Sequence, residues 1–454
     1  MVLLRAMLCV ELIAAGFAVW VAVYLLAPTL SAPMAIVTLW LLWAGVRFIA
    51  HDVCLVTIHT PQASRITDLM PMLDKSERQY VPTPYLLHSN LQTLFAVMGR
   101  PDPNVRYTRE RSYIVYRDGE IALFDWSLAK EPSTVVELAK LVKADSVKLD
   151  TMSNIACKPI IVVLFHGLTG GSVDSNMHYL TKIFNAHGLH VVIPVRRGCG
   201  GPESLTRPKH YAYGDVEDSV CVVDHIARTN PKALLVGLGV SAGSNVLANY
   251  LGTQGANSKL LGAVSIANGY CWERGTTAIA EHHPVWDMIM ATMVHAKLFA
   301  QHTIFDTKST VASATYDQAN PEIRRSSSGV QRSMRKYDDE VSRKLHGFDT
   351  LDSFYRHQSC LHRIDQIRVP MVFMNSLDDP LVHRSVIPVE TLQKNPFTAL
   401  VTTNSGGHLG HAEGLWPFRR SYTWMDRFGL QAVAAVIFSS QQKHFAEYQR
   451  NNKT

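Results

Sequence analysis

The sequence predicts an α/β fold in which helices flank both faces of a mostly parallel central sheet. Short apolar runs alternate along the chain with segments of helical periodicity. The runs are apolar at successive positions, as expected for strands buried between two layers of helices. The composition agrees, because 47% of the 454 residues are hydrophobic and 18% are charged, so the chain can bury a large core.

The predicted elements begin with a hairpin whose strands, 112–116 and 121–126, are joined by the turn Arg117-Asp-Gly-Glu120. A polar insertion with one helical stretch near 135–142 follows. Buried strands are then predicted at 160–165, 191–194, 234–240 and 260–267, separated by helices at 177–187, 216–227 and 244–251. The alternation pauses before two last strands at 369–375 and 398–403, which suggests a helical insertion over the end of the sheet.

The N-terminal segment is predicted to lie in a membrane. The run from Leu12 to Val46 contains no charged residue, and one bilayer span needs about 20 apolar helical residues. Pro28 and Pro33 divide the run, so a kinked single span and a shallow hairpin both fit. A cleaved signal peptide and a buried soluble helix are the alternatives, although a proline directly after the cleavage site disfavours the first. The flanking charges leave the orientation and the organelle open.

Charge and cysteine content argue against several other classes of protein. The formal net charge of +6 is too dilute for a nucleic-acid interface, so no nucleic-acid partner is expected. The 7 cysteines lie far apart without a Cys-x-x-Cys pair, which indicates neither a disulfide framework nor a zinc ribbon. Metal-ligand spacing is equally lacking, and we expect neither a metal nor a cofactor.

The pentapeptide Gly239-Val-Ser-Ala-Gly243 falls where a predicted strand ends and a helix begins. Glycines are needed on both sides of the serine, because a side chain there would clash in so tight a strand-to-helix turn. The pattern predicts that Ser241 is a nucleophile exposed at the end of the strand. An ordinary glycine-rich turn is the alternative interpretation.

A serine hydroxyl becomes an effective nucleophile when a histidine removes its proton and a carboxylate orients that histidine. When the serine follows a strand in this way, the acid and then the histidine follow later strands. Asp379 begins an Asp-Pro-Leu-Val turn after strand 369–375 and is the predicted acid, with Asp378 as the alternative. His408, after strand 398–403 and a Gly-Gly turn, is the predicted base, with His411 as the second candidate.

Attack on an ester carbonyl creates an oxyanion that needs prepositioned N–H donors. We expect these donors to be the amides of Ala242, directly after the nucleophile, and of Leu168, in the loop after strand 160–165. His166 in the same loop is predicted to shape the loop, because its position does not fit the triad order. The glycine-rich loop 196–201 is predicted to lie beside the site, and nothing in the sequence marks a partner that would activate Cys199.

Two further segments can be interpreted from their composition. The stretch 285–304 fits either a cap helix that lines an acyl-chain tunnel or a helix packed against its neighbours. It contains Trp286, Met288, Ile289, Met290, Met293, Leu298 and Phe299. The Ser/Arg-rich patch Arg324–Ser328 is predicted to be an exposed, mobile loop.

Three motifs together resemble the abhydrolase-domain (AB hydrolase 4) family of α/β-hydrolases: His166-Gly-Leu-Thr-Gly-Gly-Ser172, Arg197-Gly-Cys-Gly200 and Gly239-Val-Ser-Ala-Gly243. Later stretches are similar to the acylglycerol lipases of that family: Leu345-His-Gly-Phe348, Ser359-Cys-Leu-His-Arg-Ile364, Asn375-Ser-Leu-Asp-Asp-Pro-Leu-Val-His383, Gly406-Gly-His-Leu-Gly410 and Thr423-Trp-Met-Asp426. The resemblance implies an α/β-hydrolase fold, one N-terminal membrane helix, and Ser241, Asp379 and His408 as nucleophile, acid and base.

These observations predict five segments: a membrane anchor (1–52), a linker or docking segment (53–110), the first part of a hydrolase core (111–270), a helical cap insertion (271–366) and the second part of the core (367–454). The expected function is a membrane-anchored, single-pass serine hydrolase that cleaves lipid esters, most simply an acylglycerol lipase. A phospholipase or a short-chain carboxylesterase would use the same machinery. A lipid-sensing interaction protein on a hydrolase scaffold is the alternative of another class. The expected partners are a lipid ester and the membrane, and the oligomeric state is not predicted.

Overall fold

The computed structural model describes residues 37, 40, 43–45, 55–59, 69, 80–98, 109–116, 118–142, 158–199, 213–214, 216–308, 331–419 and 422–451, with the backbone alone for 136, 139, 298–308, 419 and 441–451. Most of the predicted anchor and the patch Arg324–Ser328 therefore lie outside the described residues.

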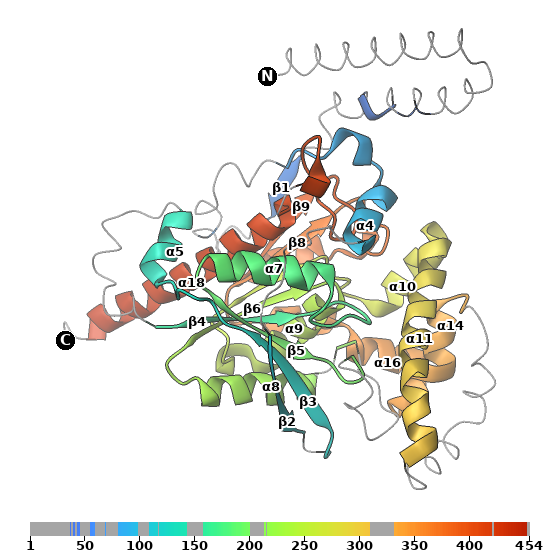
Figure 1. Cartoon of the computed structure of the whole chain (residues 1–454), viewed down its shortest axis with the longest axis horizontal. Helices are drawn as coiled ribbons and strands as arrows, with labels where there is room; N and C mark the ends of the chain where they lie inside the picture. Colours follow the sequence, from blue (N-terminus) through green and yellow to red (C-terminus); the bar gives the residue numbers. More distant parts are fainter. Residues whose placement is uncertain are drawn as a thin grey trace.

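In the described part of the chain, 9 strands form one sheet in the order β1-β9-β8-β7-β6-β4-β5-β3-β2 (Figure 1). The strands from β9 to β5 run parallel, whereas β1, β3 and β2 pair antiparallel at the two edges. The bounds are β1 (Val56–His59), β2 (Glu110–Val115), β3 (Ile121–Ser127), β4 (Ile160–Phe165), β5 (His190–Val195), β6 (Leu234–Val240), β7 (Ala263–Ile266), β8 (Met371–Ser376) and β9 (Thr398–Thr403).

The uninterrupted apolar run of β4 shows why a parallel sheet forms here. All six residues of the strand are buried, and alternate residues enter two different cores. One core takes Ile160, Val162 and Leu164, and the other takes Ile161, Val163 and Phe165. Because both faces of the strand are covered, apolar residues are favoured at every position, as the sequence pattern indicated.

Helices cover the two faces of the sheet as predicted (Figure 1). One face carries α5 (Val135–Leu141), α7 (Ser175–Ala186) and the long α18 (Trp424–Asn451). The other carries α8 (Val216–Thr229), α9 (Ala242–Gln254) and α17 (Val389–Lys394). The prediction of a mostly parallel, helix-covered sheet is confirmed.

The segment predicted as a linker or docking segment contributes regular structure to the fold. Strand β1 pairs antiparallel with β9, and α4 (Ser89–Met98) follows it. The sequence analysis identified neither element. Strand β7 is also shorter than the predicted strand 260–267.

Along the chain, a group of helices lies between β7 and β8, where the cap insertion was predicted. It comprises α10 (Trp272–His282), α11 (Pro284–Lys308), α14 (Met334–Tyr337), the π-helical turn η7 (Asp338–Ser342), α15 (Arg343–Leu345) and α16 (Leu351–Gln358). Their inner sides form a separate apolar cluster that includes Val294, Met334 and Phe354. Figure 1 shows this group beside one end of the sheet.

None of the helices in the ranges described above has both the length and the apolar character needed to cross a bilayer. Of the predicted anchor 1–52, these ranges include only residues 37, 40 and 43–45. The anchor prediction thus lies outside the described residues.

Candidate active site

Ser241 occupies the turn between β6 and α9 with a strained backbone, φ 53° and ψ −125°. Its N–H donates to the carbonyl of Ile266 at 2.8 Å, which ties the turn to β7. A Cβ on Gly239 would lie 2.6 Å from the oxygen of Gly243, and a Cβ on Gly243 would lie 2.6 Å from the carbonyl carbon of Phe165. Both glycines are therefore required, and the turn holds the serine at the end of the strand.

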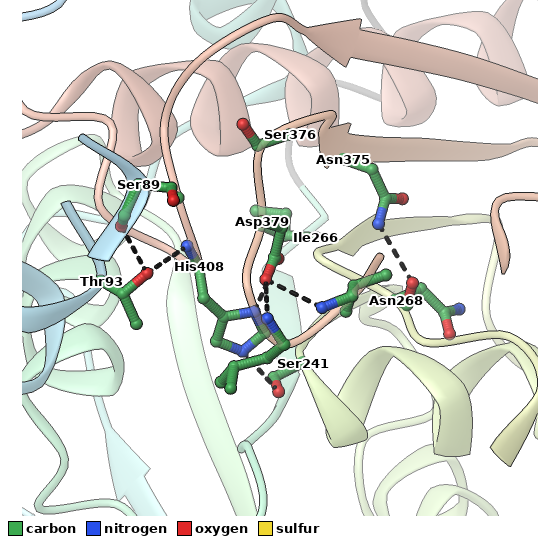
Figure 2. Close-up of polar contacts among 12 residues, drawn as sticks. Ser89, Thr93, Ser241, Ile266, Asn268, Asn375, Ser376, Asp379 and His408 are labelled. Carbon is green, nitrogen blue, oxygen red and sulfur yellow. Dashed lines mark hydrogen bonds and ion pairs between the residues drawn. The ribbon is translucent and has the colours of Figure 1, made fainter. Parts of the chain in front are cut away.

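His408 links the serine to a carboxylate (Figure 2). Its Nε2 lies 2.8 Å from Ser241 Oγ, and its Nδ1 lies 2.7 Å from Asp379 Oδ2. The other oxygen of Asp379 accepts the N–H groups of Leu381 at 2.8 Å and Val382 at 3.0 Å. A carboxylate held in this way accepts a hydrogen bond from the Nδ1–H group, which leaves Nε2 unprotonated and able to take the serine proton.

Asp378 binds the histidine loop by a different route. Its Oδ1 accepts the N–H of Gly407 at 2.9 Å and the hydroxyl of Ser376 at 2.6 Å. Burial raises the pKa of this carboxyl to about 6, with repulsion from Asp379 as a smaller cause. Of the two acids considered from the sequence, Asp379 contacts the imidazole and Asp378 fixes the turn before it.

His411, the second candidate base, is a buried packing residue. Its ring packs against those of Tyr80 and Trp424, with centroids 5.1 and 5.3 Å away. Its Nε2 lies 3.0 Å from Thr403 Oγ1. Burial lowers the pKa of His411 to about 3, so the ring is neutral at physiological pH. It supports the turn from inside, where a Cβ on Gly406 would lie 2.6 Å from the ring carbon Cδ2 of His411.

Helix α4 supplies a contact to the site that sequence reasoning missed. The backbone N–H of His408 donates to Thr93 Oγ1 at 3.0 Å, and that hydroxyl donates to the carbonyl of Ser89 at 2.8 Å (Figure 2). Gln92 Oε1 accepts the N–H of Ala412 at 2.9 Å. The available signal was the pair of polar residues, Gln92 and Thr93, on the buried side of a short helix.

The predicted oxyanion donors lie beside the nucleophile. Leu168 and Ala242 both line the cavity that contains Ser241. Ala242 is the first residue of α9, and the first N–H groups of a helix lack an intrahelical acceptor. These positions are consistent with the predicted oxyanion donors, which stay a prediction.

His166 shapes the Leu168 loop. Its Nε2 accepts the N–H of Arg196 at 3.1 Å, and its Nδ1 donates to the carbonyl of Gly167 at 2.9 Å. The Arg196 guanidinium also donates to the carbonyls of His166 and Gly167. Burial, reinforced by Arg196, lowers the pKa of His166 to about 3. The neutral ring thus stabilises the loop through its two hydrogen bonds.

Cys199, in the glycine-rich loop beside the site, is not activated as a nucleophile. Burial raises the pKa of Cys199 to about 11, which keeps the thiol protonated and unreactive at neutral pH. Within the ranges that the structure describes, no three His, Cys, Asp or Glu side chains are grouped so that they could hold a metal ion.

A cavity of about 450 Å³ opens above Ser241 and His408, within the usual range for small-molecule sites. The cap contributes Trp286, Ile289, Met290 and Met293 at helical spacing along one face of α11. On another face of the same helix, Ala291 and Val294 pack into the cap cluster. One face of the stretch 285–304 therefore lines the cavity and another packs within the cap, while the acyl-chain tunnel stays a prediction. The side chains of Leu298 and Phe299 lie outside the described residues.

The geometry defines a serine hydrolase of the α/β type, and a comparison with protein families agrees. The family described as serine aminopeptidase, S33 (Hydrolase_4), matches residues 158–398, which include Ser241 and Asp379. The chain belongs to this family, and the expectation of a serine hydrolase is confirmed.

Three individual relatives share 26% to 32% of their aligned residues with this chain. Phospholipase ABHD3 of Mus musculus is 28% identical over 362 residues, covering 79% of each chain. Monoacylglycerol lipase ABHD2 of Mus musculus is 32% identical over 288 residues, covering 61% of this chain and 66% of the relative. Embryogenesis-associated protein EMB8 of Picea glauca is 26% identical over 355 residues, covering 76% and 70%. The predicted likeness to abhydrolase-domain proteins is confirmed.

Proposed function

We propose that this protein is a membrane-anchored hydrolase that cleaves carboxylic esters of lipids, most simply monoacylglycerols. The observation that carries the proposal is the hydrogen-bonded chain Ser241–His408–Asp379 at the floor of a mainly apolar cavity. A hydroxyl activated in this way attacks acyl carbonyls, and an apolar cavity above it suits a hydrocarbon chain.

The proposed reaction runs through an acyl-enzyme. Ser241 Oγ attacks the ester carbonyl while His408 Nε2 takes the hydroxyl proton, and Asp379 stabilises the imidazolium that results. The amides of Leu168 and Ala242 donate to the oxyanion, and one such donor is worth roughly 2.7–4 kcal/mol of barrier. The ester C–O bond then breaks, His408 returns the proton to the leaving alcohol, and the acyl group remains on Oγ. A water activated by His408 attacks the acyl carbonyl and releases the fatty acid and the free serine.

Two observations support a lipid substrate. The cap side chains Ile289, Met290 and Met293 line the cavity, and each buried methylene of an acyl chain contributes about 0.8 kcal/mol to binding. The relatives named above are a monoacylglycerol lipase and a phospholipase. The phospholipase aligns with more of this chain, 79% against 61%, and phospholipid cleavage is therefore the second candidate.

The membrane part of the proposal rests on the sequence. The uncharged run from Leu12 to Val46 is long enough for a bilayer span and precedes the catalytic fold. An anchored enzyme meets an insoluble ester in the plane where that ester is concentrated. We expect the full chain to remain with membranes after a carbonate wash, and release into the supernatant would contradict the anchor.

A substrate panel tests the reaction. The full chain in detergent micelles is assayed on monooleoylglycerol, on phosphatidylcholine and on a soluble butyrate ester, with Ser241→Ala as the control. We expect hydrolysis of monooleoylglycerol and the butyrate ester by the native chain and none by the variant. Faster release of fatty acid from phosphatidylcholine would favour the phospholipase. A folded native chain that cleaves none of the three would overturn the proposal.

A further inference from the structure

The outer face of α4 is apolar where a surface helix is usually polar. Leu94, Val97 and Met98 have exposed fractions of 42%, 62% and 81%. Their spacing of three and then one residue places them on one side of the helix. Thr93, which contacts the histidine loop, lies on an adjacent face of the same helix.

The chain after the histidine loop adds three more exposed apolar side chains next to α4. Leu415, Trp416 and Phe418 are exposed by 62%, 70% and 49%. The ring of Phe418 packs on Phe95 of α4 at 5.2 Å, and the hydroxyl of Tyr85 donates to the carbonyl of Leu415 at 2.7 Å. The apolar patch thus consists of Leu94, Val97, Met98, Leu415, Trp416 and Phe418.

The apolar patch continues into the cavity. Val97 is largely exposed and also lines the cavity above the nucleophile, together with Ala96. Asn90, at the start of the same helix, accepts the indole N–H of Trp286 at 2.9 Å, so α4 reaches the cap as well. Figure 1 shows α4 between the β9 end of the sheet and the cap helices. A ligand on the patch therefore lies at the rim of the site.

A tryptophan of the uncharged N-terminal run lies close to the start of α4. The uncharged run that ends at Val46 includes Trp43, whose ring lies 6.4 Å from that of His88, directly before α4. The most hydrophobic segment of the chain thus ends beside the patch. Tryptophan and phenylalanine at such a surface are typical of side chains at the boundary between headgroups and acyl chains.

We propose that the apolar patch rests on the surface of a lipid bilayer, so that the cavity opens onto the membrane and takes its ester directly from it. This inference rests on the proposed lipid-ester hydrolysis and adds the route by which the ester enters. It commits to a bilayer as the occupant, and a second copy of the chain on the patch would contradict it.

Activity on two esters tests the proposal. Met98→Glu combined with Leu415→Glu places two charges on the patch outside the cavity lining. Tyr113→Glu combined with Val115→Glu, at residues 69% and 61% exposed on β2 at the far edge of the sheet, is the matched control. Each full chain is reconstituted into phosphatidylcholine vesicles that contain monooleoylglycerol, and is also assayed on a soluble butyrate ester.

We expect the patch variant to lose about tenfold or more of its rate on the vesicle ester while its rate on the soluble ester stays within about twofold. The control variant should match the native chain on both esters. An unchanged vesicle rate, or an equal loss on both esters, would overturn the proposal. So would a native dimer in light scattering that the patch variant dissociates.

A second readout does not depend on hydrolysis. A bimane dye on Met98→Cys, compared with Tyr113→Cys and the unaltered chain labelled in parallel, reports contact with vesicles that contain brominated phosphatidylcholine. We expect quenching at position 98 alone. Equal emission at both positions would reject the bilayer contact even if the chain hydrolyses esters, whereas quenching by a chain that cleaves no ester would reject the enzymatic proposal instead.

Discussion

The ends of the parallel strands and the cap helices build their halves of the site in different ways. At the strand ends, the two carboxylates are fixed by hydrogen bonds from backbone N–H groups: Leu381 and Val382 donate to Asp379, and Gly407 donates to Asp378. The cap offers the cavity a face of methionine, isoleucine and tryptophan. Its buried carboxyl, Asp338, accepts hydrogen bonds from Tyr355 of the cap and from Tyr213, which precedes α8, and it does not line the cavity.

This difference predicts that the strand ends carry out the reaction and that the cap determines which ester is cleaved. Strand ends are rigid, and a rigid element holds reacting groups within the small tolerances that catalysis requires. A cap that contributes only shape alters which ester fits and leaves the reacting atoms unchanged. Changes at the strand ends should therefore affect every ester, and changes in the cap should discriminate among esters.

The largest expected effect separates two neighbouring acids. Asp379→Asn removes the carboxylate that orients His408 and should lower kcat on a soluble ester by about 10⁴-fold. Asp378→Asn keeps an acceptor for Gly407 and should cost no more than about 100-fold. Steady-state rates, with circular dichroism as the test of folding, check both variants. Equal losses of kcat would show that the two acids do not differ in role, although Asp379 contacts His408 at 2.7 Å and Asp378 contacts Gly407 at 2.9 Å.

The next effect concerns the helix that supports the histidine. Thr93→Val leaves the buried N–H of His408 without its acceptor, at a cost of about 1–3 kcal/mol. Because the unpaired N–H shifts the backbone of His408, the imidazole moves away from Ser241. We therefore expect kcat on a soluble ester to fall roughly 10- to 100-fold. Thr93→Ser retains the hydroxyl and should restore the rate. A Thr93→Val enzyme with native kcat and a lower melting temperature would show that Thr93 stabilises the fold without positioning the imidazole.

A smaller and more selective effect is expected in the cap. Met290→Trp fills the cavity, so kcat/KM for a long-chain monoacylglycerol should fall by about tenfold or more while that for a butyrate ester changes little. Met288→Trp, on an exposed part of α11, is the matched control and should behave like the native chain. The ratio of the two kcat/KM values is the measurement. An equal loss on both esters would mean that the cap also positions the reacting groups.

The smallest effect on rate is expected from Asp338, which accepts the hydroxyls of Tyr213 at 2.6 Å and Tyr355 at 2.9 Å. Burial raises the pKa of this carboxyl from 3.8 to about 6. Because the folded pKa lies above the unfolded one, the folded state binds the extra proton, and this stabilisation is lost as pH rises from about 4 through 6.

Asp338→Asn removes that titration. The unfolding free energy of the native chain should therefore fall relative to that of the variant by up to roughly 3 kcal/mol between pH 4 and pH 7. Denaturant titrations at pH 4, 5, 6 and 7 measure this difference. Parallel pH profiles for the two chains would show that Asp338 does not titrate in this range.

Much of the strand-end half could be predicted from the sequence, because local rules specify it. A strand that enters two cores must be apolar throughout, and the turn at Ser241 tolerates only glycine at positions 239 and 243. These constraints leave patterns in adjacent residues. The contacts of His408 with Ser241 and Asp379 followed from the order of the strands.

The rest depends on contacts between residues far apart in the chain. Thr93 and His408 are 315 positions apart, and nothing near Thr93 in the sequence marks the contact. Strand β1 has only four residues and is defined by its pairing with β9. The stretch 285–304 allowed two interpretations because periodicity alone does not show which face of a helix lines a cavity.

Covalent trapping of the nucleophile tests the central claim most directly. The full chain is treated with a fluorophosphonate and its tryptic peptides are sequenced by mass spectrometry, with Ser241→Ala and His408→Ala in parallel. We expect one phosphonate, on Ser241, formed by the native chain, absent from the serine variant and much slower in the histidine variant. A folded native chain that stays unmodified at Ser241, or that reacts equally fast without His408, would contradict the account.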